Sequence, residues 1–218
     1  MPGYLILIDG PSGVGKSSLT KKLAQSLRAL RFFVAEFSED AADNRRGQIV
    51  EARLSGANDY QLADLFTQHR MEIYQRVVFP ALENFDFVIL DRGEPSTMVY
   101  QTMRKEMTIE EVFNQHRLHE IKIPDLIVIL VCQPEMASFR KESEGQVRQE
   151  REAGNNLKGK FTKDSETQRV ICRQYCEVFE FLKSRTNAIL IENDNLSIDQ
   201  EVSLILKKIS KNGNHLPK

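Results

Sequence analysis

The chain has 218 residues, 41% of them hydrophobic, and its 30 Lys and Arg against 31 Asp and Glu leave a formal net charge of −1. This length suits one domain, or one domain with an insertion, and no global basic field is available for nucleic acid, although a local basic groove stays open. With three cysteines and no apolar stretch of membrane-spanning length, the composition predicts a reduced, cytoplasmic protein without a membrane partner.

Five short apolar runs predict buried strands. They are rich in Ile, Val, Leu and Phe and lack polar alternation, which is typical of strands covered on both faces, as in a parallel sheet. Helical patterns separate them, so we expect a doubly wound α/β fold, a five-stranded parallel sheet with helices on both faces and right-handed crossovers. The expected strands are Tyr4–Ile8, Phe32–Phe37, Phe85–Leu90, Asp125–Cys132 and Ala188–Ile191.

A glycine-rich stretch follows the first expected strand and precedes residues with helical spacing. Strand, glycine loop and helix are the context that a phosphate-binding loop requires, because glycine N–H groups can turn in around phosphate oxygens and the helix N-terminus adds positive charge. Lys16 would reach the β- and γ-phosphates, and the Ser17 hydroxyl would bind Mg²⁺. The residues expected to hold a nucleoside triphosphate are Gly10, Ser12, Gly13, Val14, Gly15, Lys16, Ser17 and Ser18.

The connection between the second and third strands contains further candidates. Glu36 closes the second strand and Glu39 follows it. A carboxylate there could orient Mg²⁺ or accept a hydroxyl proton, and solvated loop acids explain the pair equally well. The mostly helical segment 44–82 then puts Phe66 and Arg70 four residues apart on one helical face, where they could stack on a base and bond its edge or a phosphate.

Asp91 and Arg92 end the third strand, and in an open α/β sheet ligands bind at the carboxyl ends of the strands. Asp91 could hold Mg²⁺ directly or through water, and Arg92 could grip a phosphate in a bidentate fork. The alternative is an Asp–Arg turn in which the two residues cap each other or a helix end. His116 and His119 flank a helical turn without a metalloprotease pattern, so we expect them to be exposed.

Residues 140–163, after the fourth strand, are highly charged and include three glycines. The simplest interpretation is a solvated surface segment. A second interpretation is a lid that carries arginines onto the phosphates when it closes. We therefore expect a single domain over residues 1–218, with the lid inside it.

These motifs resemble the thymidylate kinase family. The most specific match is the pattern Asp-Arg-x-x-x-Ser-x-x-x-Tyr-Gln, and Leu65-Phe66-Thr-Gln-His-Arg70 is similar to the family's Phe-x-x-x-Arg helix. The resemblance covers most of the chain in order, since the segments 47–56, 78–82, 124–126 and 134–137 also have counterparts. Asp91, Arg92, Ser96, Tyr100 and Gln101 carry the first pattern.

The resemblance implies a P-loop kinase fold and phosphoryl transfer from ATP, with Mg²⁺, to a pyrimidine deoxynucleoside monophosphate such as dTMP. Arg92 would hold the acceptor phosphate, Phe66 would stack on the base, and Arg70 and Gln101 would bond its edge. Relatives are usually dimers, so a homodimer is expected. The catalytic candidates are Lys16, Glu36, Asp91, Arg92, Arg148 and Arg151, the last two from the lid, and the substrate-binding candidates are Phe66, Arg70, Arg92, Ser96, Tyr100 and Gln101.

Three positions depart from the family pattern. Ser12 stands where the family carries an acidic or basic loop residue, Gly93 replaces an aromatic residue, and only Glu36 matches the family's Arg-Glu-Pro-Gly element. Two alternatives therefore stay open. One is a kinase acting on a deoxynucleoside or on a nucleotide within DNA, with Glu36 as base, although Arg92 would then have no phosphate to bind. The other is a P-loop ATPase or switch module working through a protein partner.

Overall fold

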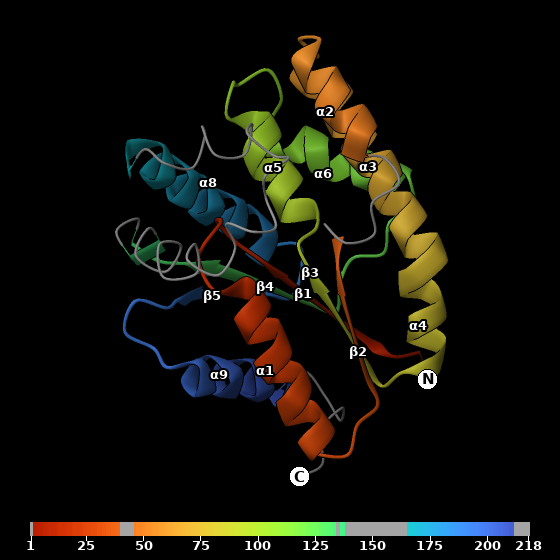
Figure 1. Ribbon diagram of the computed structural model, residues 1–218, viewed down its shortest axis with the longest axis vertical. Coiled ribbons are helices and arrows are strands. Elements are labelled where there is room, and N and C mark those ends of the chain that lie inside the picture. Colours follow the sequence, from red (N-terminus) through yellow and green to blue (C-terminus); the bar gives the residue numbers. More distant parts are fainter. Residues whose placement is uncertain (1, 40–45, 134–135, 138–164, 212–218) are drawn as a thin grey trace.

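The structure is a computed structural model that describes residues 2–39, 46–133, 136–137 and 165–211. Within these residues five strands form one sheet in the order β2-β3-β1-β4-β5 (Figure 1). All four pairings between neighbours are parallel, which confirms the predicted architecture. The strands are β1 (Tyr4–Asp9), β2 (Val34–Ser38), β3 (Phe87–Asp91), β4 (Leu126–Val131) and β5 (Ala188–Glu192).

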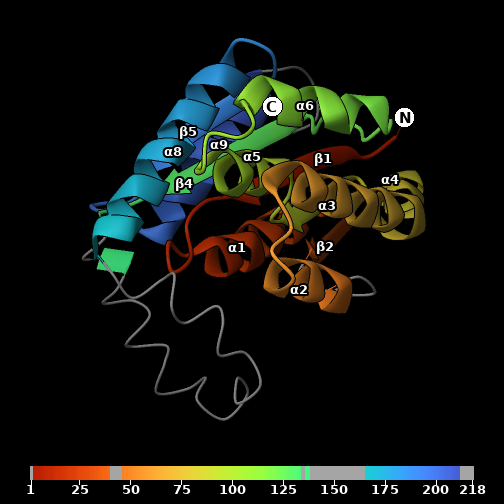
Figure 2. The ribbon, with the colours of Figure 1, turned by 90° about the horizontal axis from the view of Figure 1, so that it is seen from above.

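Helices cover both faces of this sheet (Figures 1 and 2). One face packs against the first and last helices of the chain, and the other against the helices between β2 and β5. The helices are α1 (Lys16–Ala29), α2 (Arg46–Leu54), α3 (Asp59–Ile73), the π-helical turn η2 (Tyr74–Val78), α4 (Phe79–Asn84), α5 (Glu94–Thr102), α6 (Ile109–Leu118), α8 (Ser165–Lys183) and α9 (Ile198–Lys211).

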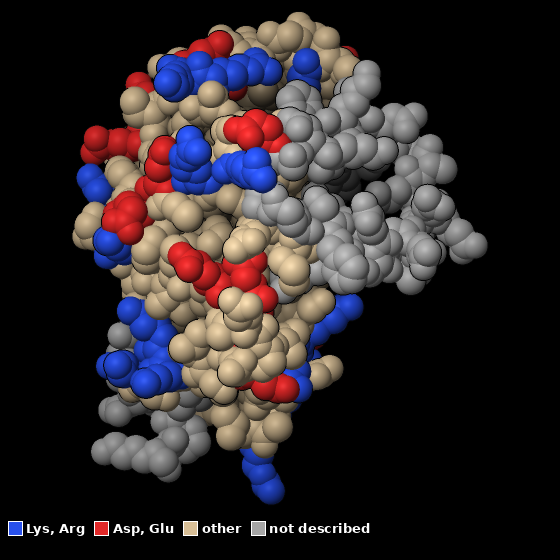
Figure 3. All heavy atoms as spheres, turned by 90° about the vertical axis from the view of Figure 1, so that its left-hand side faces the viewer, with Lys and Arg blue, Asp and Glu red and all other residues tan. Residues whose placement is uncertain are grey.

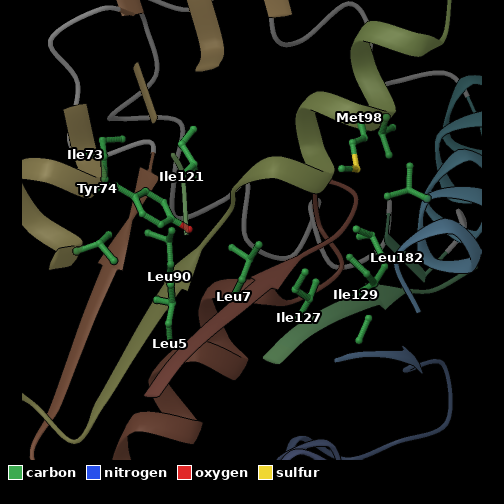
Figure 4. Close-up of a cluster of buried hydrophobic side chains, with 14 of the residues drawn as sticks. Leu5, Leu7, Ile73, Tyr74, Leu90, Met98, Ile121, Ile127, Ile129 and Leu182 are labelled. Atoms are coloured by element: carbon green, nitrogen blue, oxygen red, sulfur yellow. The ribbon is translucent and has the colours of Figure 1, made fainter. Parts of the chain in front are cut away.

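Each face of the sheet has its own hydrophobic core, because alternate strand residues point to opposite sides. Leu5 and Leu7 of β1 belong to the core under α3, α5 and α8, where Figure 4 shows them beside Leu90. Ile6 and Ile8 belong to the core under α1 and α9. Both sets are apolar, which explains why the strands lack polar alternation.

Three strands begin later than predicted, β4 by one residue and β2 and β3 by two. Phe32 lies before β2 and packs edge-on against Phe87, with ring centroids 5.0 Å apart. Phe85 ends α4, its N–H donating to the carbonyl of Ala81. Both aromatic residues contribute apolar surface without joining a strand ladder, so hydrophobicity alone gave the wrong starting points.

The carboxyl ends of the three strands on one side of the sheet lie in register. Ile8 of β1 pairs with Asp91 of β3, and Ser38 of β2 also pairs with Asp91. Reciprocal capping boxes at Asn58 and Thr108 fix where α3 and α6 begin. Strand register and helix starts together determine which polar side chains meet at this edge.

Candidate active site

The loop after β1 depends on glycine at several positions. Gly10, Gly13 and Gly15 have φ angles of 155°, 85° and 103°, in the region that residues with a Cβ rarely adopt. A Cβ on Gly10 would also lie 2.2 Å from the carbonyl oxygen of Leu130. Gly15 directly precedes α1, so the loop delivers its N–H groups to the start of that helix.

The loop is fixed at both ends by buried polar side chains. The Gly10 N–H donates to Asp9 Oδ1 at 2.7 Å, and Asn193 Nδ2 donates to the Val14 carbonyl at 2.9 Å. Neither Asp9 nor Asn193 was among the predicted site residues. The signal was present for Asp9, because it is the one charged residue in an otherwise apolar strand.

Lys16 and Ser17 occupy the first turn of α1, as predicted. Lys16 Nζ donates to the carbonyls of Gly10 and Pro11, both at 2.8 Å, so its ammonium lies within the curve of the loop. Ser17 Oγ donates to Asp91 Oδ2 at 2.8 Å. Ser12 and Gly13 are half-buried, and Ser17 and Ser18 are exposed, which leaves this part of the loop accessible to a ligand.

The pair of Ser17 and Asp91 fits a Mg²⁺ ion. Hydroxyl and carboxylate oxygens are the ligands that Mg²⁺ prefers, and it takes one or two from the protein while retaining waters. Burial raises the pKa of Asp91, although its bond from Ser17 and the charge of Lys16 oppose that shift. The described residues hold no group of three or more His, Cys, Asp or Glu with metal-binding geometry, so a Mg²⁺ ion here would rely on phosphate oxygens and water as well.

The corner after β3 presents Arg92 with an unusual backbone. Arg92 has φ of 75°, and its N–H donates to the Ile8 carbonyl at 3.0 Å. The next residue, Gly93, is extended, and a Cβ on it would lie 2.8 Å from Leu7 Cδ1. A side chain at position 93 would therefore require Leu7 to shift.

Asp9 links this corner to the phosphate loop. Besides the bond from Gly10, its carboxylate accepts bonds from the N–H groups of Gly93 and Ser96 at 3.1 and 2.9 Å. It also accepts from the hydroxyls of Ser96 and Tyr175 at 2.8 and 3.1 Å. The Ser96 hydroxyl, predicted to bind substrate, is therefore engaged with Asp9.

Arg70 lies fully buried where four segments converge. Its Nη2 is 2.8 Å from Glu39 Oε1 and 3.2 Å from Thr97 Oγ1, and its Nη1 bonds to His116 Nε2. These partners come from the end of β2, from α5 and from α6. The guanidinium is thus held in one orientation, with its Nε among the buried atoms that lack a partner in the described part of the chain.

The prediction that His116 and His119 are exposed is wrong, because His116 is buried and His119 is half-buried. His116 is fully buried, and its Nδ1 donates to the Val112 carbonyl at 2.7 Å. Its Nε2 must then be the acceptor that faces Arg70, since a guanidinium can only donate. Burial, followed by the charge of Arg70, lowers the pKa of His116 well below its ordinary value, so the ring is neutral.

This environment predicts a pH-dependent contribution of His116 to stability. An unfolded histidine titrates at about 6.5, so below that pH the unfolded chain binds a proton that the folded chain refuses. The free energy of unfolding should fall on acidification below pH 6.5, by up to about 1.4 kcal/mol per pH unit. In His116→Gln this loss should be absent, which urea unfolding at pH 5.5, 6.5 and 7.5 would measure.

Glu94 changes the free energy of unfolding in the opposite direction over the same pH range. Burial, opposed by Arg117 and Arg70, raises its pKa to about 6, so between its unfolded pKa and pH 6 the folded chain binds the extra proton and acidification stabilises it. Because Glu94 is present in both proteins, its contribution cancels from the difference between wild type and His116→Gln. A difference that does not change with pH would contradict a neutral buried His116.

Aromatic and cationic side chains gather beside Arg92. The Arg53 guanidinium lies over the Phe66 ring, 5.4 Å from its centroid. The pKa of Arg53 is lowered by burial and also by the charges of Arg104 and Arg92, while Tyr100 opposes these shifts. Arg53 was in a segment that resembles the family, but no role had been predicted for it.

Two predicted substrate contacts differ in their surroundings. Gln101 is buried, and its Oε1 has no hydrogen-bond partner within the described residues. Tyr100 is half-buried, with its pKa raised by burial. Buried polar atoms are nearly always paired, so the open atoms of Gln101 and Arg70 indicate a place for a polar ligand or water.

The structure does not bring Glu36 to the phosphate loop. Glu36 lies on the α1 face of β2, where Arg28 Nη1 donates to it at 3.0 Å. Glu39, beyond the end of the strand, is the carboxylate that enters the site. Arg148 and Arg151, with the predicted lid at 140–163, lie outside the described residues.

Comparison with known proteins identifies the family. The family model described as thymidylate kinase matches residues 8–203. The chain belongs to the thymidylate kinase family. A probable thymidylate kinase of Methanosarcina acetivorans is 35% identical over 153 residues, 67% of this chain and 73% of that protein. A thymidylate kinase of Chlorobaculum tepidum is 33% identical over 144 residues, 64% of this chain and 67% of that protein.

Membership of the thymidylate kinase family confirms the resemblance drawn from the Asp91–Gln101 and Phe66–Arg70 motifs. It also covers both halves of the site, since the matched region runs from the end of β1 into α9. None of the helices in the described ranges is long and apolar enough to span a bilayer.

Proposed function

We propose that this chain transfers the γ-phosphoryl group of ATP, in the presence of Mg²⁺, to dTMP or a closely related pyrimidine deoxynucleoside monophosphate. The observation that carries the proposal is that Asp9 joins the phosphate-binding loop at Gly10 to the corner at Gly93, directly after Arg92. Family membership supports it, because the matching relatives are named thymidylate kinases.

On the donor side, positive charge is concentrated at the phosphate loop. Lys16 Nζ, which donates to two loop carbonyls, is positioned to donate to phosphate oxygens instead. Ser17 and Asp91 would hold Mg²⁺, which supplies charge neutralisation between the β- and γ-phosphates. Loop N–H groups and the start of α1 add further stabilisation of developing negative charge.

On the acceptor side, cationic side chains and an aromatic ring face match the chemistry of a nucleoside monophosphate. Arg92 and Arg53 supply charge for the phosphate, and Phe66 supplies a ring on which a base can stack. Gln101 Oε1 is a buried acceptor and Arg70 Nε a buried donor, both open. Thymine presents N3–H beside a carbonyl, which complements such a pair, whereas cytosine presents an acceptor at N3.

The alternatives have less support. A deoxynucleoside kinase with Glu36 as base would need that carboxylate at the loop, but Glu36 pairs with Arg28. For an acceptor within DNA, a basic surface would help, and the face toward α8 and β5 does not supply one, since Figure 3 shows Lys and Arg interspersed with Asp and Glu there. A switch module acting through a partner would gain nothing from the open polar atoms of Gln101 and Arg70.

Some parts of the sequence-based prediction remain predictions here. We propose that Arg148 or Arg151 contributes charge to the phosphates from a lid over residues 140–163. A homodimer and a cytoplasmic location are likewise expected from the family rather than supported by any contact within the described residues.

Release of ADP from ATP and Mg²⁺ across a panel of acceptors tests the proposal. The panel contains dTMP, dUMP, dCMP, thymidine and short DNA. We expect the highest kcat/KM with dTMP, lower values with the other monophosphates, and background rates with thymidine and DNA. Equal rates with and without any acceptor would instead favour an ATPase.

Arg92→Ala should raise the KM for dTMP about 100-fold while leaving the KM for ATP nearly unchanged, because one charge-assisted phosphate contact is worth about 2–3 kcal/mol. Initial rates with each substrate varied in turn would separate the two constants. Arg28→Ala is the matched control, since it removes an arginine whose partner is Glu36. An unaltered KM for dTMP in Arg92→Ala would contradict the assignment of this arginine to the acceptor phosphate.

A further inference from the structure

Asp9 is a completely buried carboxylate whose hydrogen-bond donors come from three separate parts of the chain. Gly10 belongs to the phosphate loop, Gly93 and Ser96 to the corner that carries Arg92, and Tyr175 to α8. Each of these groups donates a hydrogen bond to the carboxylate. One rigid planar group thus joins the donor loop and the acceptor corner.

The two oxygens divide these contacts. Oδ1 accepts from the Gly10 N–H and from the hydroxyls of Ser96 and Tyr175, and Oδ2 accepts from the N–H groups of Gly93 and Ser96. The glycines have no side chain through which another group could hold them. Any displacement of the loop at Gly10 therefore acts on the corner at Gly93 through this carboxylate.

We infer that Asp9 and Tyr175 are positioning residues, which set the placement of the phosphate loop relative to Arg92 and so align donor and acceptor for transfer. The inference rests on the proposed function, because it concerns the geometry of the same reaction. Neither residue touches a reacting atom. Asp9 acts through Gly10 and Gly93, and Tyr175 acts through the hydrogen bond that its hydroxyl donates to Asp9.

The use of a carboxylate at this position carries a cost for ligand binding. Its negative charge lies directly behind a loop that binds a polyanion, which opposes ATP binding. A neutral amide would avoid that repulsion but could not accept from all of these donors, since its nitrogen carries hydrogens. We therefore expect alignment to require the carboxylate, and ATP affinity to stay the same or improve when the carboxylate is replaced by an amide.

This gives a kinetic signature. Asp9→Asn should lower kcat about 100-fold, the scale expected for misplaced reacting groups, with a KM for ATP equal to or below that of wild type. Tyr175→Phe, which removes one of three donors to Oδ1, should lower kcat about 10-fold. Both are measured with dTMP and normalised to the folded fraction from circular dichroism.

Tyr4→Phe is the matched control. Tyr4 is also buried, at the opposite end of β1, and its hydroxyl donates to the Asp125 carbonyl at 3.1 Å. It should keep the wild-type kcat. A Tyr175→Phe variant that resembles Tyr4→Phe in kcat would overturn the inference, even if Asp9→Asn fails to fold.

Amide hydrogen exchange provides a readout that does not require the acceptor to be known. Binding of an ATP analogue with an imido group between the β- and γ-phosphates should slow exchange in peptides containing residues 92–96 of wild type and of Tyr4→Phe. That protection should be lost in Tyr175→Phe, although the analogue still protects the loop. Protection that is absent in wild type, or retained in Tyr175→Phe, would overturn the inference, whereas failure of the acceptor panel alone would overturn only the proposed function.

Discussion

Lys16→Ala is expected to lower kcat for phosphoryl transfer by about 10³-fold, because it removes the cation enclosed by the phosphate loop. The ammonium makes its two bonds to carbonyls of the loop itself, Gly10 and Pro11. Its removal therefore takes away charge where the transferred group must be stabilised and leaves the hydrophobic cores untouched. ADP release at saturating ATP and dTMP measures the effect.

The melting temperature should stay within a few degrees of wild type, so the loss of rate reflects chemistry and not unfolding. Lys21→Ala provides the control, since Lys21 is an exposed lysine on the same helix, five residues further on. It should keep the wild-type rate. If Lys16→Ala keeps more than a tenth of the wild-type kcat, Lys16 has no part in stabilising the transferred phosphoryl group.

The sheet and the phosphate loop could be predicted because local sequence determines them. A strand covered on both faces must be apolar along its whole length, and a loop whose N–H groups turn inward requires glycine where φ is positive. Gly10 shows both constraints, since its backbone angle and the nearby Leu130 carbonyl each exclude a side chain. The position at the end of the third strand indicated Arg92, and family resemblance then supplied Gln101.

The polar contacts around the site could not be predicted in the same way, because they join residues far apart in the sequence. His116 bonds to Arg70 across 46 positions, and Tyr175 to Asp9 across 166. Helical spacing indicates which face a histidine occupies, but not which buried cation lies against it. The starting residues of β2 and β3, by contrast, were predicted wrongly for a local reason. Aromatic residues can pack on a sheet without joining one of its strands.

The choice between Glu36 and Glu39 could have been improved from sequence. Residues two apart in a strand share a face, so Glu36 points to the same side as Val34, toward α1. Arg28 near the end of α1 is then its natural partner. Glu39 lies beyond Ser38, the last residue of β2, where the chain is free to turn toward α3.

Arg70→Met should lower the free energy of unfolding by about 3–5 kcal/mol, because it leaves the Glu39 carboxylate buried without its cation. It should also weaken dTMP binding, since we propose that the open Nε of this guanidinium bonds the base. Urea unfolding at pH 7.5 measures the first effect and the KM for dTMP the second. Methionine is chosen because it keeps most of the apolar volume of the arginine stem.

The chain offers a closely matched control. Arg28 and Glu36 form an ion pair of the same residue types at a similar N–O distance, 3.0 Å against 2.8 Å. That pair is partly exposed, whereas Arg70 is 1% exposed, so Arg28→Met should cost less than about 1 kcal/mol. Equal costs for the two substitutions would contradict the interpretation of Arg70 and Glu39 as a desolvated pair.

The double variant Arg70→Met with Glu39→Gln separates stability from binding. Neutralising Glu39 removes the unpaired charge, so the double variant should recover much of the stability lost in Arg70→Met, and the cycle should give a coupling of about 1–3 kcal/mol. It should not recover affinity for dTMP, because no guanidinium returns to the pocket. Recovery of both would mean that Arg70 serves only to neutralise Glu39, and base recognition would then fall to Gln101 and Phe66.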